Sequence, residues 1–358
     1  MSRRVRVAVV LGGRSSEHDI SVASAQSVIE SLDPARYEVV TVEIGRDGAW
    51  QMGSGQPALS GPVPEGHVPV PGTETGPTET GPSETLPVPA SGGSVATTLA
   101  EVDVVFPVLH GPFGEDGTVQ GLLELADVPY VGAGVLASAV CMDKDVFKAV
   151  MRDNDIPVTR NITLRLGDEA RNPFGYPVFV KPARLGSSVG ISKAHDEDEL
   201  RAAVELAFRH DEKILVEEFV SGVEIEVGVL GAGANVRVSL PGEIVAHAEW
   251  YDYSAKYDEG GMELIVPARI TEEQSARVQD LAHRAFVATE CEGMVRADCF
   301  VRDDGEVLVN ELNTIPGFTA TSVYTRLFEA SGVSYAEQLD RLVQVAIDRW
   351  ERRKRLLF

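Results

Sequence analysis

A predicted β-strand ends in the residues Val309-Asn310-Glu311-Leu312-Asn313-Thr314-Ile315-Pro316-Gly317, where the Pro-Gly pair stops the extended chain. Because side chains alternate between the two faces of a strand, Glu311 and Asn313 point the same way. Arg296 and Asp298 share one face of a second predicted strand for the same reason. If the two strands pair, two carboxylates, an amide and a guanidinium meet on one face. Their oxygen atoms suit Mg²⁺, although a solvated sheet face is the simpler interpretation of Glu-x-Asn alone.

The composition describes a globular protein large enough for two or three domains. The chain has 358 residues, a formal net charge of −23 and 44% hydrophobic residues. This acidic charge argues against a nucleic-acid partner, and no apolar run reaches the ~18 residues that a membrane span needs. The short apolar run near the N-terminus predicts a first strand and not a signal peptide, so we expect a cytoplasmic protein. Cys141, Cys291 and Cys299 are widely spaced in apolar settings, which predicts reduced buried thiols.

Residues 1–135 predict an αβ unit with a mostly parallel sheet. Strands are expected at 4–11, 38–44, 102–109 and 128–133, with one helix up to about Leu32 and another up to Glu124. Two polar side chains follow predicted strands, at the edge where open α/β sheets bind ligands. One is Glu17, which could equally serve the helix dipole. The other is His110, for which a structural role is the more common outcome.

Residues 52–94 differ in character from the rest of the chain. They contain the repeat Thr-Glu-Thr-Gly-Pro-Thr-Glu-Thr-Gly-Pro-Ser-Glu-Thr at 73–85. Such a segment has too few apolar side chains to offset the entropy lost on ordering. We therefore expect a disordered surface insertion without a catalytic role.

The middle of the chain predicts an anion-binding loop. A helix over 136–154 carries Lys144, and a strand that ends with Lys181 leads into the loop Pro-Ala-Arg-Leu-Gly-Ser-Ser-Val-Gly. This loop offers backbone N–H groups, the hydroxyls of Ser187 and Ser188, and no acidic side chain, which suits phosphate oxygens. The lysines add compact charges of the kind that bind phosphate. The loop lacks the P-loop pattern, and a plain hairpin turn is the alternative.

Further along, the helix expected at 196–210 has one apolar face, and 214–227 predicts strand, turn and strand. Acidic side chains in these strands could accept from a ribose or an amino group, or could face solvent. The segment 249–261 is aromatic and charged, which is typical of functional loops. Capping residues at Thr271 and Ser334 predict the starts of two later helices.

Five motifs, in this order, resemble those of the D-alanine–D-alanine ligases of the ATP-grasp superfamily. They are Gly-Gly-Arg-Ser-Ser-Glu-His-Asp-Ile-Ser, His-Gly-Pro-Phe-Gly-Glu-Asp-Gly-Thr-Val-Gln-Gly, Val-Lys-Pro-Ala-Arg-Leu-Gly-Ser-Ser-Val-Gly, Tyr-Asp-Tyr-Ser-Ala-Lys-Tyr and Glu-Leu-Asn-Thr-Ile-Pro-Gly-Phe-Thr. The resemblance runs from about residue 5 to 345 and implies an α/β (α+β) ATP-grasp fold. The domains it implies are an N-terminal parallel-sheet αβ domain at 1–140, a central subdomain at 141–222, and a C-terminal subdomain at 223–358 with the metal site and a closing loop at 246–261.

The resemblance also implies a role for each site residue. ATP would be contacted by Lys144, Lys181, Ser187, Ser188, Glu217, Phe219, Val220, Glu224, Lys256, Asn310 and Glu311. Two Mg²⁺ ions, or Mn²⁺ in their place, would be held by Asp298, Glu311 and Asn313. Substrate would be bound by Glu17, His110, Arg296, Gly317 and Ser322. Catalysis would depend on Glu17, Ser187, Tyr257 and Arg296.

Within these sets, Glu217 would meet the adenine amino group and Glu224 the ribose hydroxyls. Glu17 would bind the ammonium of the first D-alanine, while Arg296 and Ser322 would bind the carboxylate of the second. Tyr257 would come from the closing loop and link to Ser187 and Glu17.

The activity implied is ATP-dependent joining of two D-alanine molecules through an acyl phosphate, for peptidoglycan precursor synthesis, by a homodimer. The residue types suit it, because such catalysis is mostly positioning and charge stabilisation. One alternative is a ligase that joins D-alanine to D-lactate or D-serine. Another is a non-catalytic nucleotide-binding protein of the same fold, although none of the expected metal ligands or phosphate lysines is missing from the sequence.

Overall fold

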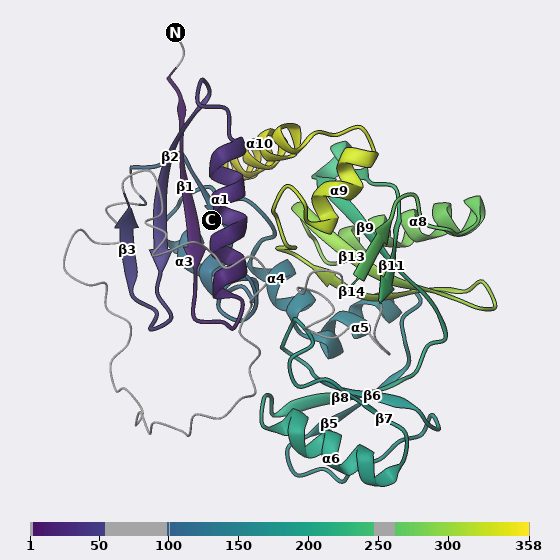
Figure 1. Ribbon diagram of the computed structural model, residues 1–358. Coiled ribbons are helices and arrows are strands. Elements are labelled where there is room, and N and C mark those ends of the chain that lie inside the picture. Colours follow the sequence, from purple (N-terminus) through teal and green to yellow (C-terminus); the bar gives the residue numbers. More distant parts are fainter. Residues whose placement is uncertain (1–2, 54–98, 100, 247–261, 358) are drawn as a thin grey trace.

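The computed structural model describes residues 3–53, 99, 101–246 and 262–357, which form three β-sheets with helices packed against them (Figure 1). The predictions for most of the 52–94 insertion and for the loop at 249–261 fall outside these described residues. In the described part, no helix is both long and apolar enough to cross a membrane.

The first sheet contains β1 (Val5–Gly12), β2 (Tyr37–Ile44), β3 (Trp50–Gly53) and β4 (Val104–Pro107), in the order β3-β2-β1-β4. β1 runs parallel to β2 and β4, and only β3 is antiparallel, so the mostly parallel sheet is confirmed. The strand predicted at 128–133 is wrong, because this segment makes only a single bridge, between Tyr130 and Val105.

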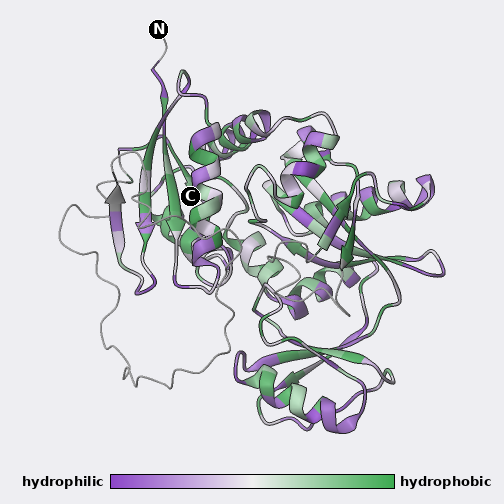
Figure 2. Cartoon of the chain, in the orientation of Figure 1, coloured by the Kyte–Doolittle hydropathy of each residue, from purple (hydrophilic) through white to green (hydrophobic). Residues whose placement is uncertain are grey.

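Both faces of this sheet are covered. Along β1, Val7, Val9 and Leu11 join a core with α1 (His18–Ser31) and α10 (Tyr335–Arg353). The alternate residues Ala8 and Val10 join a second core with α3 (Thr118–Leu125). A strand that is buried on both faces needs a continuous apolar run, which explains the sequence of β1. In Figure 2 most of β1 has the hydrophobic colour.

The second sheet is antiparallel and forms the lower lobe in Figure 1. It contains β5 (Asn161–Arg165), β6 (Val178–Pro182), β7 (Ser192–Ala194) and β8 (Lys213–Glu218), in the order β5-β8-β6-β7. The helix α6 (Glu197–Phe208) packs against it through its predicted apolar face. Asp196 caps this helix by accepting from the backbone N–H groups of Asp198 and Glu199.

The third sheet has the order β12-β11-β9-β13-β14, with β10 paired to β9. Its strands are β9 (Gly222–Gly231), β10 (Arg237–Val238), β11 (Gly242–Ala246), β12 (Met262–Ile265), β13 (Gly293–Arg302) and β14 (Val307–Asn313). The short 3-10 helix Gly233–Asn235 and the α-helices α8 (Glu272–Ala288) and α9 (Val323–Ala330) complete this part. The predicted capping residues Thr271 and Ser334 are confirmed, because their side chains accept from the N–H groups of Gln274 and Glu337.

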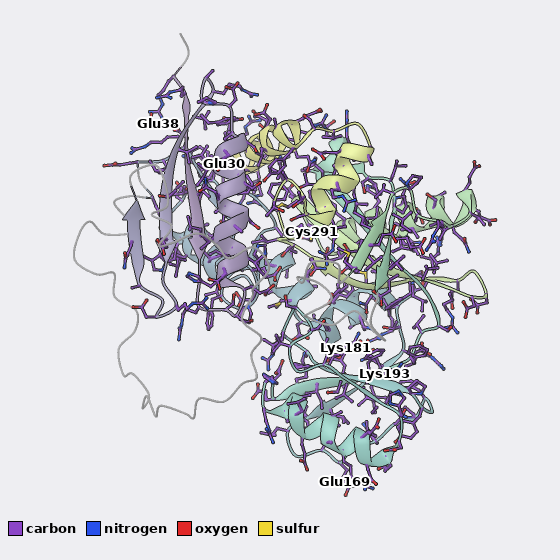
Figure 3. All side chains as sticks on the ribbon, in the orientation of Figure 1. Glu30, Glu38, Glu169, Lys181, Lys193 and Cys291 are labelled. Carbon is purple, nitrogen blue, oxygen red and sulfur yellow. The ribbon has the colours of Figure 1, made fainter. Side chains whose placement is uncertain are left out.

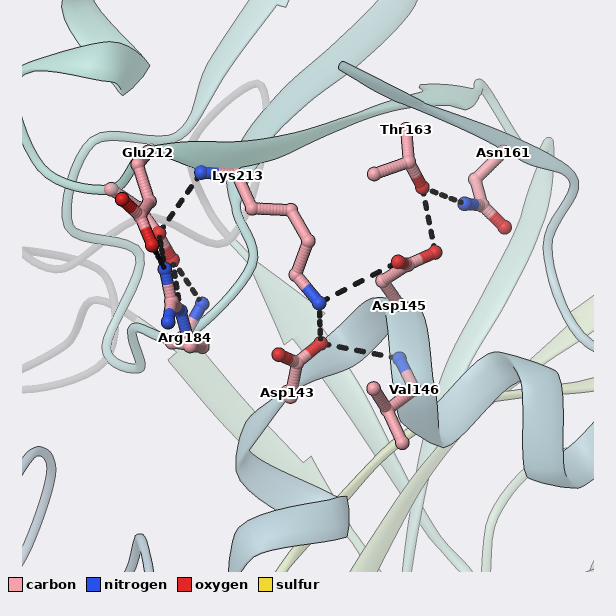
Figure 4. Close-up of polar contacts among 9 residues, drawn as sticks. Asp143, Asp145, Val146, Asn161, Thr163, Arg184, Glu212 and Lys213 are labelled. Atoms are coloured by element: carbon pink, nitrogen blue, oxygen red, sulfur yellow. Dashed lines mark hydrogen bonds and ion pairs between the residues drawn. The ribbon is translucent and has the colours of Figure 1, made fainter. Parts of the chain in front are cut away.

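The single helix predicted at 136–154 is wrong, because the chain forms two helices, α4 (Val135–Met142) and α5 (Lys144–Asp153). Asp143 lies between them in an extended conformation, and its carboxylate accepts from the N–H of Val146. Asp is a strong N-cap residue, so it starts a new helix here. The Lys213 ammonium lies 2.6 Å from the Asp143 carboxylate, and this contact, drawn in Figure 4, fixes the start of α5 to β8.

Both α4 and α5 contribute to the core of the third sheet, through residues such as Cys141, Phe147 and Met151. α5 therefore lies where the second sheet meets the third. The domain boundaries at 140 and 222 stay a prediction.

Candidate active site

A cavity of about 220 Å³ lies between the second and third sheets, beside α5. The residues predicted to contact ATP that line it are Lys144, Lys181, Ser188, Glu217, Phe219, Val220, Glu224, Asn310 and Glu311. Figure 3 places Lys181 at the junction between the lower lobe and the rest of the molecule. Aromatic and aliphatic side chains such as Phe179 and Ile191 share the cavity with these charges, a mixture typical of nucleotide pockets.

The predicted metal ligands come together on two paired strands. β13 and β14 are antiparallel neighbours, with Asp298 opposite Glu311 and Arg296 opposite Asn313, so the pairing expected from the sequence is confirmed. A bulge follows Asp298 in the ladder. Bulges often change the direction of side chains next to active sites. This one lies between Asp298, on the polar face, and the buried Cys299.

The side chains at this pairing are closely connected. The Arg296 guanidinium donates to both oxygens of Asp298, at 2.7 and 2.8 Å, and the Asn313 amide donates to Asp298 Oδ2 at 3.0 Å. The Glu311 carboxylate lies 3.4 Å from the Lys144 ammonium. Both carboxylates, Asp298 and Glu311, therefore lie beside positively charged side chains.

The donor set fits Mg²⁺ or Mn²⁺. Two carboxylates and one amide face each other, and rotation of the Asn313 side chain would present its oxygen. No group of three or more His, Cys, Asp or Glu that could hold a metal occurs among the described residues. Mg²⁺ does not require such a group, because it is usually bound by one or two carboxylates together with substrate phosphates.

A further carboxylate, Glu226, belongs to this cluster and was not predicted. It lies on β9 opposite Asp298, is buried, and comes within 3.0 Å of Arg296 Nε. The guanidinium of Arg296 therefore lies between two acidic side chains. The alternation Glu224-x-Glu226 was a usable signal, because both residues share one face of a strand.

Glu217 lies at the wall of the cavity and is almost completely buried, with 2% of its surface exposed. Lys148 Nζ is 2.7 Å from its Oε1, and Lys181 Nζ is 2.6 Å from its Oε2. Burial works to raise the pKa of Glu217, but the charges of Lys148 and Lys181 outweigh it and hold this pKa at about 2. Lys148 was missed from the sequence, although it lies one helical turn after Lys144.

The predicted substrate residues gather at the junction of the first sheet with the other two. The Ser187 hydroxyl, in the loop after β6, donates to the carboxylate of Glu17 at the start of α1. His110 is buried, and its Nδ1 is 2.9 Å from the carbonyl oxygen of Ile315, just after β14. Burial lowers the pKa of His110 although the nearby Glu17 charge works to raise it, so the ring is neutral at neutral pH.

The chain comes very close to Glu17 at Gly111. A Cβ atom built on Gly111 would lie 2.7 Å from Glu17 Oε2, and its φ is +73°, so glycine is required there. The N–H of Gly111 donates to the carboxylate of Glu115 at 2.8 Å. Burial, together with the charge of Glu17, raises the pKa of Glu115 to about 8. Sequence patterns do not distinguish this half-buried carboxyl from an ordinary helix cap.

Ser322 and Gly317 meet at the N-terminus of α9. Ser322 occupies the N-cap position and its hydroxyl accepts from the N–H of Thr319 at 3.0 Å, while a Cβ on Gly317 would lie 3.4 Å from that hydroxyl. A helix N-terminus offers N–H groups and a positive dipole end to a carboxylate. This position suits the carboxylate-binding role that the resemblance implies for Ser322.

The loop that carries Ser187 and Ser188 is held in an uncommon conformation. Both residues have positive φ, +50° and +59°, which non-glycine residues rarely adopt. Lys144 Nζ donates to the carbonyl oxygen of Leu185 at 2.6 Å and so ties this loop to α5. Such backbone strain is common at ligand clamps. Lys256 and Tyr257, predicted to close over the same space, lie outside the described residues.

Comparison with known proteins agrees with this arrangement. The family model described as D-ala D-ala ligase N-terminus matches residues 6–133, and the model described as D-ala D-ala ligase C-terminus matches residues 145–344. The chain belongs to the D-alanine–D-alanine ligase family. It is therefore an ATP-dependent ligase with the ATP-grasp fold, as the motifs predicted.

Relatives of this family match nearly the whole chain. D-alanine–D-alanine ligases from Streptomyces coelicolor and from Mycobacterium sp. (strain KMS) are 48% and 47% identical, over 96% and 97% of this chain and 93% and 98% of their own lengths. Among solved structures, the ligase from Coxiella burnetii is 35% identical with a TM-score of 0.81, and covers 99% of this chain and 97% of its own.

Two other solved structures are informative about substrates. The D-Ala:D-Ser ligase VanG from Enterococcus faecalis is 33% identical with a TM-score of 0.77, over 96% of this chain and 100% of its own. A D-alanine–D-alanine ligase from Bacillus anthracis complexed with ATP is 25% identical with a TM-score of 0.73, over 98% of this chain and 99% of its own.

Proposed function

We propose that this protein joins two D-alanine molecules to D-alanyl-D-alanine at the cost of one ATP, as a step in peptidoglycan precursor synthesis. The observation that carries the proposal is the convergence of Glu17, Ser187 and Arg296. Glu17 lies at the start of α1, Ser187 in the loop after β6 and Arg296 on β13. The Ser187 hydroxyl donates to Glu17, and the charges of Glu17 and Arg296 both act on His110. Lys144 and Lys181 line the cavity, together with Asp298, to which Arg296 donates. This reaction needs a carboxylate that binds the substrate ammonium, a guanidinium that binds the substrate carboxylate, and lysines that bind the phosphates of ATP.

In the first half-reaction a carboxylate becomes an acyl phosphate. Glu17 receives the ammonium of the first D-alanine, so that the carboxylate of this molecule points toward the cavity. One carboxylate oxygen attacks the γ-phosphorus of ATP, the bond to the β-phosphate oxygen breaks, and ADP leaves. Lys144 and Lys181 offset the charge on the transferring group, and Ser187 and Ser188 lie in the loop that covers it.

In the second half-reaction the ammonium of the second D-alanine gives a proton to a phosphate oxygen of the acyl phosphate, and the resulting amine attacks the acyl carbon. A tetrahedral oxyanion forms, then collapses to the amide as phosphate leaves. We assign Arg296 to this oxyanion and to the carboxylate of the second D-alanine, which Ser322 and the backbone of Gly317 also contact. Holding both substrates in line can supply roughly 7–11 kcal/mol of the barrier reduction.

Asp298, Glu311 and Asn313 would hold two Mg²⁺ ions, or Mn²⁺, beside the phosphates. When bound, these ions neutralise charge on the phosphate oxygens. Arg296 donates to both oxygens of Asp298, and Oδ1 keeps a second lone pair that could face a metal ion. Arg296 would then orient the Asp298 carboxylate.

The second substrate is the point where related enzymes differ, since one solved neighbour is a D-Ala:D-Ser ligase. We propose D-alanine, because Tyr257 in Tyr-Ser-Ala-Lys-Tyr matches the form that the resemblance associates with dipeptide synthesis. We also propose a cytoplasmic homodimer, as family resemblance implies. Light scattering of the purified chain would test the dimer, and a monomeric mass would contradict it.

The decisive experiment is product identification. The protein is incubated with ATP, Mg²⁺ and D-alanine alone, or with D-alanine and an equal amount of D-lactate or D-serine, and the products are separated by mass spectrometry. We expect ADP, phosphate and D-alanyl-D-alanine, with no ADP release when D-alanine is omitted. An ester or a D-alanyl-D-serine product as the main species would overturn the choice of second substrate. ADP release with no dependence on any D-amino acid would overturn the ligase proposal.

A further inference from the structure

Lys148 is a buried charge that none of the roles above uses. Its side chain is completely buried, and it lies on α5 behind Glu217. Glu217, Thr159 and Lys181 line the cavity, whereas Lys148 does not. A lysine placed out of reach of the ligand acts through the groups that it contacts.

The Lys148 ammonium is fully occupied by fixed partners. It lies 2.7 Å from Glu217 Oε1, and it donates to the carbonyl oxygen of Thr159 at 3.3 Å and to the hydroxyl of the same residue. The contact with Glu217 is an ion pair without hydrogen-bond geometry, and the two hydrogen bonds to Thr159 hold the ammonium in place beside it. Since Thr159 is itself buried, Lys148 has no route to a ligand and remains beside Glu217.

Lys181 contacts the other oxygen of the same carboxylate, but its situation differs. Its Nζ is 2.6 Å from Glu217 Oε2, yet its side chain is 12% exposed and lines the cavity. If Lys181 binds a nucleotide phosphate, as proposed above, its ammonium turns toward that phosphate and shares its charge between the phosphate and Glu217. A buried carboxylate that loses its only cation is strongly destabilised. With Lys148 in place, Glu217 keeps one.

We propose that Lys148 is a positioning residue for base selection, the fixed counter-ion that keeps the Glu217 carboxylate ionised and oriented while Lys181 moves to the nucleotide phosphates. An ionised carboxylate accepts a hydrogen bond from a 6-amino purine and repels the oxygen of a 6-oxo purine. The pair thereby selects adenine over hypoxanthine. This inference deepens the proposed ATP site and rests on it.

Several charges act on the two lysines. Burial lowers the pKa of Lys148, while the charges of Glu217 and Glu311 work to raise it. Lys148 faces Glu217 from α5 and Lys181 faces it from β6, while Glu311 on β14 acts on both lysines and Glu224 on β9 acts on Lys181. Burial works against the charge of Lys181, but Glu217 and these other carboxylates outweigh it and raise its pKa. Without Lys148, Glu217 would take up a proton whenever Lys181 turned away. Its O–H could then donate to a 6-oxo oxygen.

The test is equilibrium binding of ADP and IDP to the full chain, measured by calorimetry, which does not depend on turnover. In Lys148→Met we expect the affinity for ADP to fall by ~10–100-fold, since leaving a buried polar group without its partner has effects of about this size. The affinity for IDP should fall much less, so that the ADP-over-IDP preference drops at least ~10-fold. Lys148→Gln, which can still hydrogen-bond to Glu217, serves if the Met variant does not fold and should show the same loss of preference.

Two further variants separate base selection from general damage. Lys213→Met removes another buried lysine of the second sheet, one that pairs with Asp143 and not with Glu217 (Figure 4). It should leave the ADP-over-IDP preference within about twofold of wild type, because it shares no partner with Glu217. In a Glu217→Gln background, Lys148→Met should have no further effect on the preference, because the charge it serves is gone.

The outcomes also distinguish the two proposals. Equal loss of ADP and IDP affinity in Lys148→Met would overturn the positioning role, and so would an unchanged preference. Normal ADP binding without D-alanine-dependent ADP release would overturn the proposed ligation. The role of Lys148 in base selection would then still be decided by the ratio of ADP to IDP affinity in Lys148→Met and wild type. No ADP binding to the wild-type chain would overturn both.

Discussion

Replacing Arg296 with methionine isolates the proposed oxyanion contact. The side chain of Arg296 lies between Asp298 and Glu226, at 2.7 and 3.0 Å from its Nε. Methionine has a similar length and no charge, so it retains much of the packing and removes the guanidinium. The variant therefore loses one charged donor at the reacting carbon and leaves two carboxylates facing each other across adjacent strands.

The size of the effect follows from these contacts. Loss of one preorganised oxyanion donor typically lowers kcat by ~10²–10³, or about 2.7–4 kcal/mol. Removing one partner of a buried pair also costs up to ~3–5 kcal/mol of folding stability. The stability loss should fall at or below the lower end of this range, since Asp298 keeps the Asn313 amide as a partner. ATP affinity should change little, because Arg296 does not line the nucleotide cavity.

The assay couples ADP release to an absorbance change at saturating D-alanine, with urea unfolding measured on the same preparations. Arg269→Met is the matched control, because Arg269 pairs with the buried Glu243 at 2.9 Å on β11, away from the cavity. We expect this control to lose stability with kcat within about threefold of wild type. A folded Arg296→Met protein whose kcat also stays within about threefold of wild type would refute the assignment of Arg296.

Three further predictions address the metal site, a half-buried carboxyl and the insertion. Glu311→Gln should raise the Mg²⁺ concentration for half-maximal activity at least ~10-fold, measured by ADP release, since outer-shell changes alone can have that effect; an unchanged Mg²⁺ requirement would remove Glu311 from the ligands. Glu115 has a pKa raised to about 8 in the native state. Between the lower pKa of this carboxyl in the unfolded chain and its raised native pKa, the native state holds a proton that the unfolded chain has released, so the free energy of unfolding falls as pH rises. Urea unfolding should show Glu115→Gln gaining on wild type from pH ~5 to ~8, and a constant difference would argue against the shift. Deleting 55–92 should leave kcat within about twofold of wild type, because loop length changes stability only slowly; loss of folding, seen by circular dichroism, would contradict the disordered insertion.

Local chemistry made much of the fold predictable. The apolar run of β1, the apolar face of α6 and the capping residues Thr271 and Ser334 each depend on neighbours in sequence, and each is confirmed. The pairing of Asp298 with Glu311 was expected only if two strands came together, and the register confirms it. The helix expected at 136–154 failed because helical periodicity continues through Asp143, whose cap interrupts the backbone without interrupting the apolar pattern.

The site was less predictable where long-range contacts decide it. Lys148 has the sequence context of a surface lysine, and its burial depends on Glu217 and Thr159, which lie on other segments. Glu226 similarly belongs to the site because it pairs with Arg296, which lies far along the chain. The pKa of Glu115 is raised by burial, which no local pattern records. The roles of the individual site residues stay predictions.

The position of α10 has a consequence for how the protein is made. One face of the first sheet is covered in part by Leu339, Leu342 and Val343, which belong to the last helix of the chain (Figure 1). During synthesis, β1 leaves the ribosome long before these residues exist. The first sheet is therefore completed only after α10 has been translated, and until then this apolar face lacks its native cover. A nascent chain that stops before α10 should engage chaperones, while the full-length chain is released from them.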